Sequence, residues 1–200
     1  MPTGIALRDV REQLFGAAER VLSESGPQAL TSRAVTTEAG VAKGVLHRHF
    51  ADFDAFLVDL IRDRAARITR DGRDLIEAAG TGTVTAHIAA ALTSMFGPVA
   101  RSIVGLLIFR DDLRARIRAE RPGGMPVLGE AKDVLADYLA AERERGRVAA
   151  DADVNMLALT LIGTCHMVLA GGAEPDVSEL NRAITSIVGS VVRQPPASGG

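Results

Sequence analysis

The chain has little of what disulfide-bonded, secreted and membrane proteins need. Among its 200 residues there is a single cysteine, Cys165, so no disulfide can form within the chain. It has no tryptophan and only one tyrosine, so it lacks an aromatic belt of the kind found at membrane interfaces. Its N-terminal stretch carries no apolar run of signal-peptide length. These absences favour a cytoplasmic protein with no membrane partner.

Catalytic and metal-binding patterns are missing as well. There is no phosphate-cradling glycine loop, no nucleophile elbow and no cluster of metal ligands. Cys165 and His166 are adjacent, so on a helix they point about 100° apart and do not chelate one ion together. We therefore expect no enzyme activity, no cofactor and no metal. The net charge is −2, so any affinity for nucleic acid must come from a local basic patch.

What the sequence does contain is helical periodicity throughout, and it predicts an all-α fold. The expected helices are 9–25, 31–39, 43–49, 52–76, 84–96, 99–109, 111–121, 126–145, 154–170 and 178–192. The apolar run 99–109 is expected to be buried, whereas 111–121 is expected at the surface. We divide the chain into an N-terminal three-helix domain at 8–54, a helical regulatory and dimerisation domain at 55–194, and a disordered tail at 195–200.

Residues 31–50, TSRAVTTEAGVAKGVLHRHF, predict a helix-turn-helix. Gly40 is available for the left-handed conformation that ends a helix, so 40–42 is expected to form the turn. Leu46 and Phe50 are among the apolar positions expected to pack the two helices together. Lys43, His47 and Arg48 then point outward from the second helix, a set suited to phosphates and guanine edges in the major groove.

This stretch resembles the DNA-binding domain of the TetR family of transcriptional repressors. The family pattern T-x-x-x-I-A-x-x-A-G-V-S-x-G-x-L-Y-x-H-F-x-x-K-x-x-L is matched at Thr31, Val35, Ala39, Gly40, Val41, Gly44, Leu46, His49, Phe50 and Leu57. The resemblance implies double-stranded operator DNA as a partner. The expected DNA-binding residues are Thr31, Ser32, Arg33, Lys43, Gly44, Val45, His47, Arg48 and His49.

The chain departs from the family pattern at Ala42, Val45, His47 and Phe53. Ala42 stands where a hydroxyl residue usually caps the recognition helix, and relatives often carry a hydroxyl residue at the Val45 position. His47 replaces a tyrosine and Phe53 a lysine, two positions that typically bond DNA phosphates in the family. We expect His47 to retain that ability and Phe53 to lose it.

The stretch 154–170 is almost wholly apolar, which predicts burial on all sides. Family resemblance implies a homodimer through a four-helix bundle, and we assign helices 126–145 and 154–170 to it. The same resemblance implies a pocket for a small apolar effector. The expected lining residues are Met95, Phe96, Ile103, Leu107, Phe109, Met125, Tyr138, Cys165 and His166.

The predicted function is a homodimeric repressor that a small ligand releases from a near-palindromic operator. One alternative is an all-helical protein that binds a small molecule or haem and has no DNA role; His87 and His166 are the candidate ligands. A second alternative is a small helical enzyme, which the missing catalytic pattern disfavours.

Overall fold

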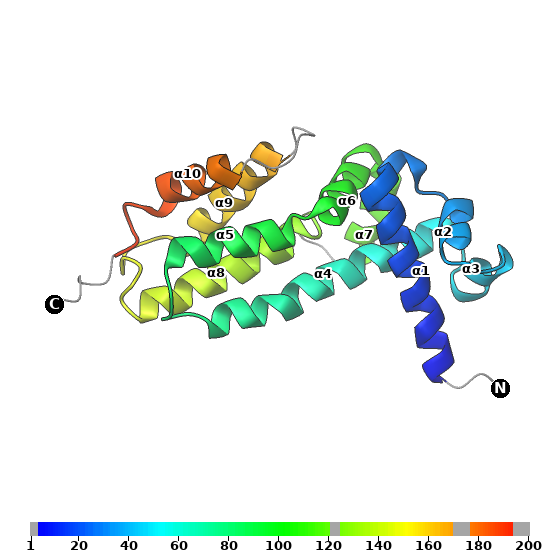
Figure 1. Cartoon of the computed structure of the whole chain (residues 1–200), viewed down its shortest axis with the longest axis horizontal. Helices are drawn as coiled ribbons and strands as arrows, with labels where there is room; N and C mark the ends of the chain where they lie inside the picture. The colour runs from blue at the N-terminus through cyan, green and yellow to red at the C-terminus, as the bar shows by residue number, and fades with distance from the viewer. Residues whose placement is uncertain (1–3, 121–124, 170–176, 194–200) are drawn as a thin grey trace. The chain divides into compact units, whose positions relative to one another are not determined.

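A computed structural model describes residues 4–120, 125–169 and 177–193 of the chain (Figure 1). Within these ranges the chain forms helices and no strand, apart from an isolated antiparallel bridge between Val148 and Val192. The all-α class expected from periodicity is therefore confirmed. No single described helix is long and apolar enough to cross a membrane, and one consecutive pair, α5 and α6, passes that test only jointly.

Most helices begin and end within two residues of the expected positions, but α1 begins at Gly4 instead of residue 9 and α10 ends at Val188 instead of residue 192. They are α1 (Gly4–Ser25), α2 (Ser32–Glu38), α3 (Gly44–His49), α4 (Phe53–Glu77), α5 (Val84–Met95), α6 (Pro98–Phe109), α7 (Asp111–Glu120), α8 (Leu128–Glu144), α9 (Val154–Leu169) and α10 (Val177–Val188). A short 3₁₀ turn, Pro27–Ala29, separates α1 from α2. The tail predicted at 195–200 lies outside the described residues.

Two compact units make up the fold: residues 1–64 with 98–123, and residues 65–97 with 124–200. Helix α4 runs without a break from Phe53 to Glu77, so it belongs to both units. The domain division expected between residues 54 and 55 stays a prediction.

The first unit is built around α1, which packs against α2 and α6. Leu14, Ala17 and Leu22 are buried on α1, as their helical spacing predicts. The hydroxyl of Ser102 on α6 donates to the Leu22 carbonyl at 3.0 Å, which fixes the C-terminal turn of α1 against α6. This scaffold carries α2 and α3.

The C-terminal end of α6 differs from the sequence-based expectation. Ala100, Ile103 and Leu107 are fully buried, but Ile108 is 45% exposed and Phe109 is 77% exposed. The prediction that the whole run 99–109 is buried was therefore wrong at these last two residues. An apolar run shows that a helix is hydrophobic, but it does not show where the packing partner ends. In α7, Leu113 and Ile117 are buried and most of the other side chains are exposed, as expected.

The second unit is formed by α5, α8, α9 and α10, with the later part of α4. Gly72 of α4 lies so close to α8 that a Cβ atom built on it would come within 2.5 Å of the Val134 methyl groups. Helix α8 is largely buried: its exposed side chains include Asp133, Asp137 and Glu144.

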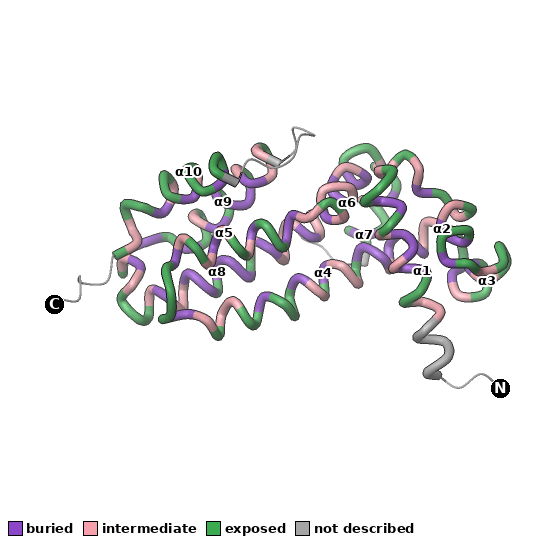
Figure 2. The backbone as a smooth tube through the Cα atoms, in the orientation of Figure 1, coloured by how far each residue is buried: buried purple, intermediate pink, exposed green. Residues whose placement is uncertain are grey.

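Helix α9 is buried on one side only in the single chain. Ala158, Leu161 and Cys165 are fully or almost fully buried, whereas Met156 is 54%, Leu159 52% and Met167 75% exposed. Figure 2 shows the burial along each helix. The expected burial on all sides is thus not met within one chain.

Candidate nucleic-acid interface

The helix-turn-helix begins with a capped helix. Thr31 has extended backbone angles, and its hydroxyl accepts a hydrogen bond from the Ala34 amide at 3.1 Å. This side-chain cap satisfies one of the amide donors left open at the start of α2. Thr36 is buried, and its hydroxyl donates to the Ser32 carbonyl at 2.9 Å, so it brings no unpaired polar group into the core.

A glycine turn connects α2 to α3. Gly40 has φ of +66°, the left-handed conformation expected for it, and its amide donates to the Thr37 carbonyl at 3.1 Å. The Val41 amide donates to the Thr36 carbonyl at 3.0 Å. Helix α3 starts after Lys43 without any side-chain cap, which agrees with the missing hydroxyl residue at position 42.

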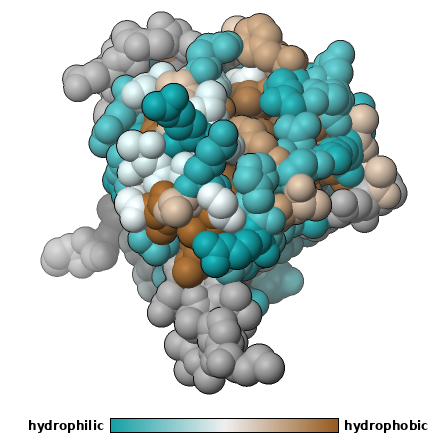
Figure 3. All heavy atoms as spheres, turned by 90° about the vertical axis from the view of Figure 1, so that its right-hand side faces the viewer, coloured by the Kyte–Doolittle hydropathy of each residue, from teal (hydrophilic) through white to brown (hydrophobic). Residues whose placement is uncertain are grey.

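The outward face of α3 is exposed and basic. Lys43, Gly44, His47 and Arg48 are exposed, and Val45 and His49 are half-buried, while Leu46 is fully buried beneath them. The last turn of α3 also carries His47, Arg48 and His49. Basic residues are favoured there because the C-terminal end of a helix dipole is negative. Figure 3, which looks onto the end of the molecule that carries α2 and α3, shows a largely hydrophilic surface with apolar patches between.

The start of α2 adds to this face. Thr31 and Arg33 are exposed and Ser32 is half-buried. Helix α2 is anchored to α1 by polar contacts at its C-terminal end: Gln13 donates to the Ala39 carbonyl at 2.7 Å, and Arg20 pairs with Glu38 at 2.5 Å. These contacts hold α2, which carries Ser32 and Arg33, against α1.

The residue that follows α3 packs into a cluster of aromatic rings. Phe50, which follows the helix, lies 6.0 Å from the ring of Phe15 and 5.0 Å from that of Phe56. The Arg11 guanidinium lies over Phe50, 4.6 Å from the ring centroid. Phe53 stacks on Phe56 at 5.6 Å. Phe53, which stands at the family's lysine position, is therefore part of this aromatic cluster.

An acidic group lies directly before α4. Asp52 caps that helix by accepting from the Ala55 amide at 2.6 Å, and both of its oxygens accept from Arg116 of α7, at 2.9 and 3.0 Å. The Arg116 hydrogen bonds, followed by that of Ala55, lower the pKa of Asp52 from 3.8 to about 2. A second arginine, Arg110, pairs with Asp54 at 2.9 Å and with Asp112 at 2.7 Å. Its side chain lowers the pKa of Asp112 below its usual range.

The residues expected to line an effector pocket are divided between the two units. Ile103 and Leu107 are fully buried in the first unit, and Phe109 is mostly exposed there. The second unit holds the other six: Met95, Phe96, Tyr138 and Cys165 are buried, and Met125 and His166 are half-buried. Burial raises the pKa of the Cys165 thiol to about 12. The thiol therefore does not readily ionise to the reactive thiolate.

Tyr138 belongs to a polar network inside the second unit. Its hydroxyl donates to the fully buried Glu142 carboxylate at 2.7 Å and lies 3.0 Å from Nδ1 of His87. Glu142 also accepts from the Gly80 amide at 3.2 Å and pairs with Arg147 at 3.3 Å. Because the Tyr138 hydroxyl donates its proton to Glu142, the Tyr138 oxygen can accept a hydrogen bond from the His87 ring. Burial, and then the Glu142 hydrogen bond, raise the pKa of Tyr138 well above its usual range.

Sequence reasoning missed the Glu142 network and the pairing of Asp52 with Arg116. The first had a signal, because Tyr138 and Glu142 are four positions apart on one helix. The second had none, since its partners are 64 positions apart. Among the described residues, no group of three or more His, Cys, Asp or Glu side chains is arranged to hold a metal ion.

Comparison with known proteins gives a family match for one segment of the chain. Residues 14–60 match the model described as "Bacterial regulatory proteins, tetR family". No curated protein matches the chain in sequence.

Solved structures share the fold at low identity. NemR of E. coli in its reduced form has a TM-score of 0.71 at 17% identity, covering 94% of this chain and 100% of its own. FadR of Bacillus subtilis, in complex with stearoyl-CoA, has 0.66 at 17%, covering 90% and 98%. SmeT, the repressor of the Stenotrophomonas maltophilia efflux pump SmeDEF, has 0.61 at 16%, covering 94% of each chain. Residues 14–60 therefore match the DNA-binding segment of bacterial regulatory proteins of the tetR family, and the chain as a whole shares its all-helical fold with these solved structures.

Proposed function

We propose that the protein is a homodimeric transcriptional repressor that binds a near-palindromic operator and leaves it when a small molecule binds. The observation that carries the proposal is the exposed face of α3, where Lys43, His47 and Arg48 point away from a packed aromatic support. A helix presented in this way has the dimensions and charge to enter a major groove.

In this proposal each residue of the face has a physical role. Arg48 and Lys43 bond phosphates or guanine edges, and His47 bonds a phosphate in place of the family's tyrosine. Gly44 lets the backbone approach the DNA because it has no side chain, and it faces open space, with no atom within 4 Å of the position a Cβ would occupy. Val45 is half-buried and contacts a thymine methyl group.

The exposed apolar face of α9 supports a dimer. Met156, Leu159 and Met167 lie along one side of this helix and are each more than half exposed in the single chain. Apolar surface of this kind is typical of a contact site, and a two-fold axis would let the same face cover itself. Helix α8, also named from the sequence, offers mainly charged residues such as Asp133 and Asp137 to solvent. We therefore propose α9 as the principal interface helix.

Effector release requires a ligand that binds the DNA-competent and the released conformations unequally. In this proposal helix α4 transmits the conformational change to the DNA-binding helices, because it is continuous through both units. Two structural relatives give the analogy: FadR was crystallised with stearoyl-CoA, and SmeT represses an efflux pump. Both share only the fold with this chain.

A mobility-shift assay with DNA from upstream of the protein's own gene tests the proposal. Binding should survive excess nonspecific competitor, and the shifted species should contain two chains by light scattering. A purified protein that binds this DNA no better than random DNA would contradict the operator proposal, and a monomer at assay concentrations would contradict the dimer. An absorption band of haem in the same preparation would favour the alternative function.

A further inference from the structure

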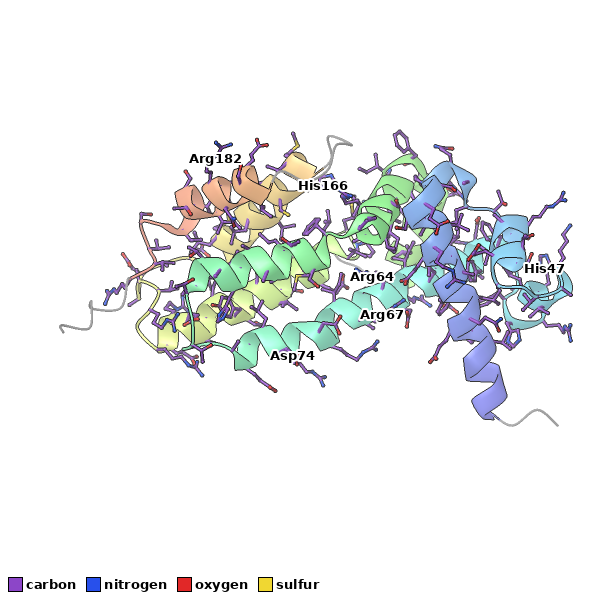
Figure 4. The ribbon with its side chains drawn as sticks, viewed as in Figure 1. His47, Arg64, Arg67, Asp74, His166 and Arg182 are labelled. Atoms are coloured by element: carbon purple, nitrogen blue, oxygen red, sulfur yellow. The ribbon has the colours of Figure 1, made fainter. Side chains whose placement is uncertain are left out.

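The position of helix α3 depends on the residues around it. The helix spans six residues, of which Leu46 is buried, and no described side chain caps its first turn. Its exposed side chains include Arg48 and His47, which is labelled in Figure 4. A helix of this length is not stable by itself in water, because so few turns do not offset the cost of nucleation. Contacts at its ends must therefore fix the direction in which these two basic side chains project.

Phe50 holds the C-terminal end of α3. Its amide donates to the Leu46 carbonyl at 3.0 Å, which closes the last turn, and its ring is buried. The ring meets that of Phe56 edge to face, with 5.0 Å between the centroids, and lies 6.0 Å from the ring of Phe15. Because this ring and this amide belong to one residue, a shift of the ring moves the end of the helix from which Arg48 projects.

A charged group covers the same ring. The Arg11 guanidinium of α1 lies 4.6 Å from the Phe50 centroid and 5.7 Å from that of Phe15. One oxygen of Asp59, on α4, pairs with this guanidinium at 2.6 Å, and the other oxygen pairs with Arg62 at 3.2 Å. The side chains of Arg11 and Asp59 are 38% and 30% exposed, so the pair is partly shielded from water. The guanidinium is thus held between a carboxylate and two aromatic rings.

Asp59 is unfavourable for DNA binding by charge alone. A carboxylate repels DNA phosphates, and the pair withdraws Arg11 from the cations available to bind them. The geometry gives the pair another role, because it holds the guanidinium over the ring of the residue that ends α3. A cation over an aromatic ring is attracted to it, so a fixed guanidinium also fixes the ring.

We infer that Asp59 and Arg11 position α3 for operator recognition. Asp59 holds the guanidinium, the guanidinium holds the ring of Phe50, and the ring sets the end of α3 that carries Arg48. Both are positioning residues within the first unit, and neither contacts DNA in this assignment. The inference rests on the proposed function and extends its specificity to two side chains outside the helix-turn-helix.

Affinities for the operator and for random DNA of the same length test the inference. Arg11→Gln should weaken operator binding by about fivefold, the effect of one lost cation–π contact, and leave random-DNA binding unchanged. The dependence of random-DNA affinity on salt should keep its slope, because no phosphate contact is lost. Full operator affinity would overturn the inference. A slope smaller in magnitude by about 0.9 would overturn it too, since Arg11 would then contact a phosphate directly.

The charge of Asp59 provides an arm with opposite expectations. Asp59→Asn keeps the size of the side chain and removes its charge, so a positioning role predicts weaker operator binding although the repulsion of phosphates is reduced. Glu12→Gln, at the exposed residue next to Arg11 in the sequence, makes the same change of charge and is the matched control. It should bind the operator at least as tightly as the wild type does. If Asp59→Asn also binds at least as tightly, the inference is overturned.

A double-mutant cycle tests whether Arg11 acts through Phe50. Phe50→Leu keeps a large apolar side chain and removes the aromatic ring. If the ring carries the effect, Arg11→Gln should weaken operator binding much less in the Phe50→Leu protein than in the wild type. An equal factor in the two backgrounds would overturn the assignment.

Hydrogen exchange without DNA separates this inference from the proposed function. Arg11→Gln should speed exchange of the Phe50 amide, whereas the Ala39 amide, which donates to the Val35 carbonyl of α2 at 2.9 Å, should exchange as in the wild type. Equal Phe50 exchange in the two proteins would overturn the inference, and so would faster exchange at both amides, because Arg11 would then stabilise the whole unit. A wild type that does not prefer the operator to random DNA would instead contradict the proposed function.

Discussion

Arg116 of α7 binds both carboxylate oxygens of Asp52, at 2.9 and 3.0 Å, and Asp52 caps the helix that follows the proposed recognition helix. The bidentate pair fixes α7 to the start of α4. The two acidic residues at this end, Asp52 and Asp54, are each bonded to an arginine. The two arginines therefore partly neutralise the negative charge that these carboxylates place next to α3.

The first prediction concerns this pair. Arg116→Ala should raise the pKa of Asp52 from about 2 toward 3.8, though not fully, because the Ala55 amide still donates to it. The folded-state pKa is depressed, so the pair's contribution to stability is present above about pH 4 and is lost as the pH falls through about 2. Carboxyl NMR titration measures the shift, with Arg118→Ala as the control on α7. An unchanged Asp52 titration in Arg116→Ala would contradict the ion pair.

The second prediction concerns the close approach of α4 and α8. Gly72→Ala would put a methyl group within 2.5 Å of Val134, so the variant should lose about 1–3 kcal/mol of unfolding free energy. Val134→Ala in the same chain should recover part of that loss. Gly129→Ala on α8 is the control, because nothing lies within 4 Å of its Cβ position. Urea denaturation gives the values, and equal stability of Gly72→Ala and Gly129→Ala would disprove the contact.

The third prediction distinguishes the two helices proposed for the dimer. Gly163 of α9 is exposed and has no atom within 4 Å of its Cβ position, so Gly163→Arg leaves the single chain intact. On the proposed interface it would bury a charge without a partner and should produce monomers. Asp137→Arg, exposed on α8, should remain dimeric. Light scattering would reject the α9 interface if Gly163→Arg stays dimeric while Asp137→Arg does not.

The fourth prediction concerns the family's tyrosine position, where this chain has exposed His47. An imidazole N–H can donate to a phosphate, as a tyrosine hydroxyl can. His47→Tyr should therefore bind the operator about as well as the wild type, whereas His47→Ala should bind it more weakly. Fluorescence anisotropy with labelled operator measures both, and full operator affinity in His47→Ala would exclude the contact.

Sequence predicted the helices well because their signals are local. Gly40 marks the turn, the buried positions Val35 and Ala39 before it are four residues apart, and buried Leu46 lies on the helix after it. The TetR resemblance rested on this same stretch and was confirmed by the family match.

Long-range relationships were beyond the reach of the sequence. The apolar run 99–109 gave no sign that Phe109 lies beyond the last packed turn. Leu161 and Leu159 are equally apolar in sequence, yet Leu161 is buried within its own chain and Leu159 is half exposed. The DNA-binding and effector-binding roles of individual residues remain predictions, since exposure and burial do not identify a ligand.

The central proposal is that side chains of α3 bind operator DNA. The affinities of Lys43→Ala and Arg48→Ala for the upstream DNA test this proposal most directly. Both side chains are exposed, so neither change should lower the melting temperature appreciably. Each should weaken specific binding, by about 1–3 kcal/mol where the lost contact reads a base. Arg73→Ala, an exposed residue of α4, is the control and should bind as the wild type does. Full operator affinity in both α3 variants would contradict the account.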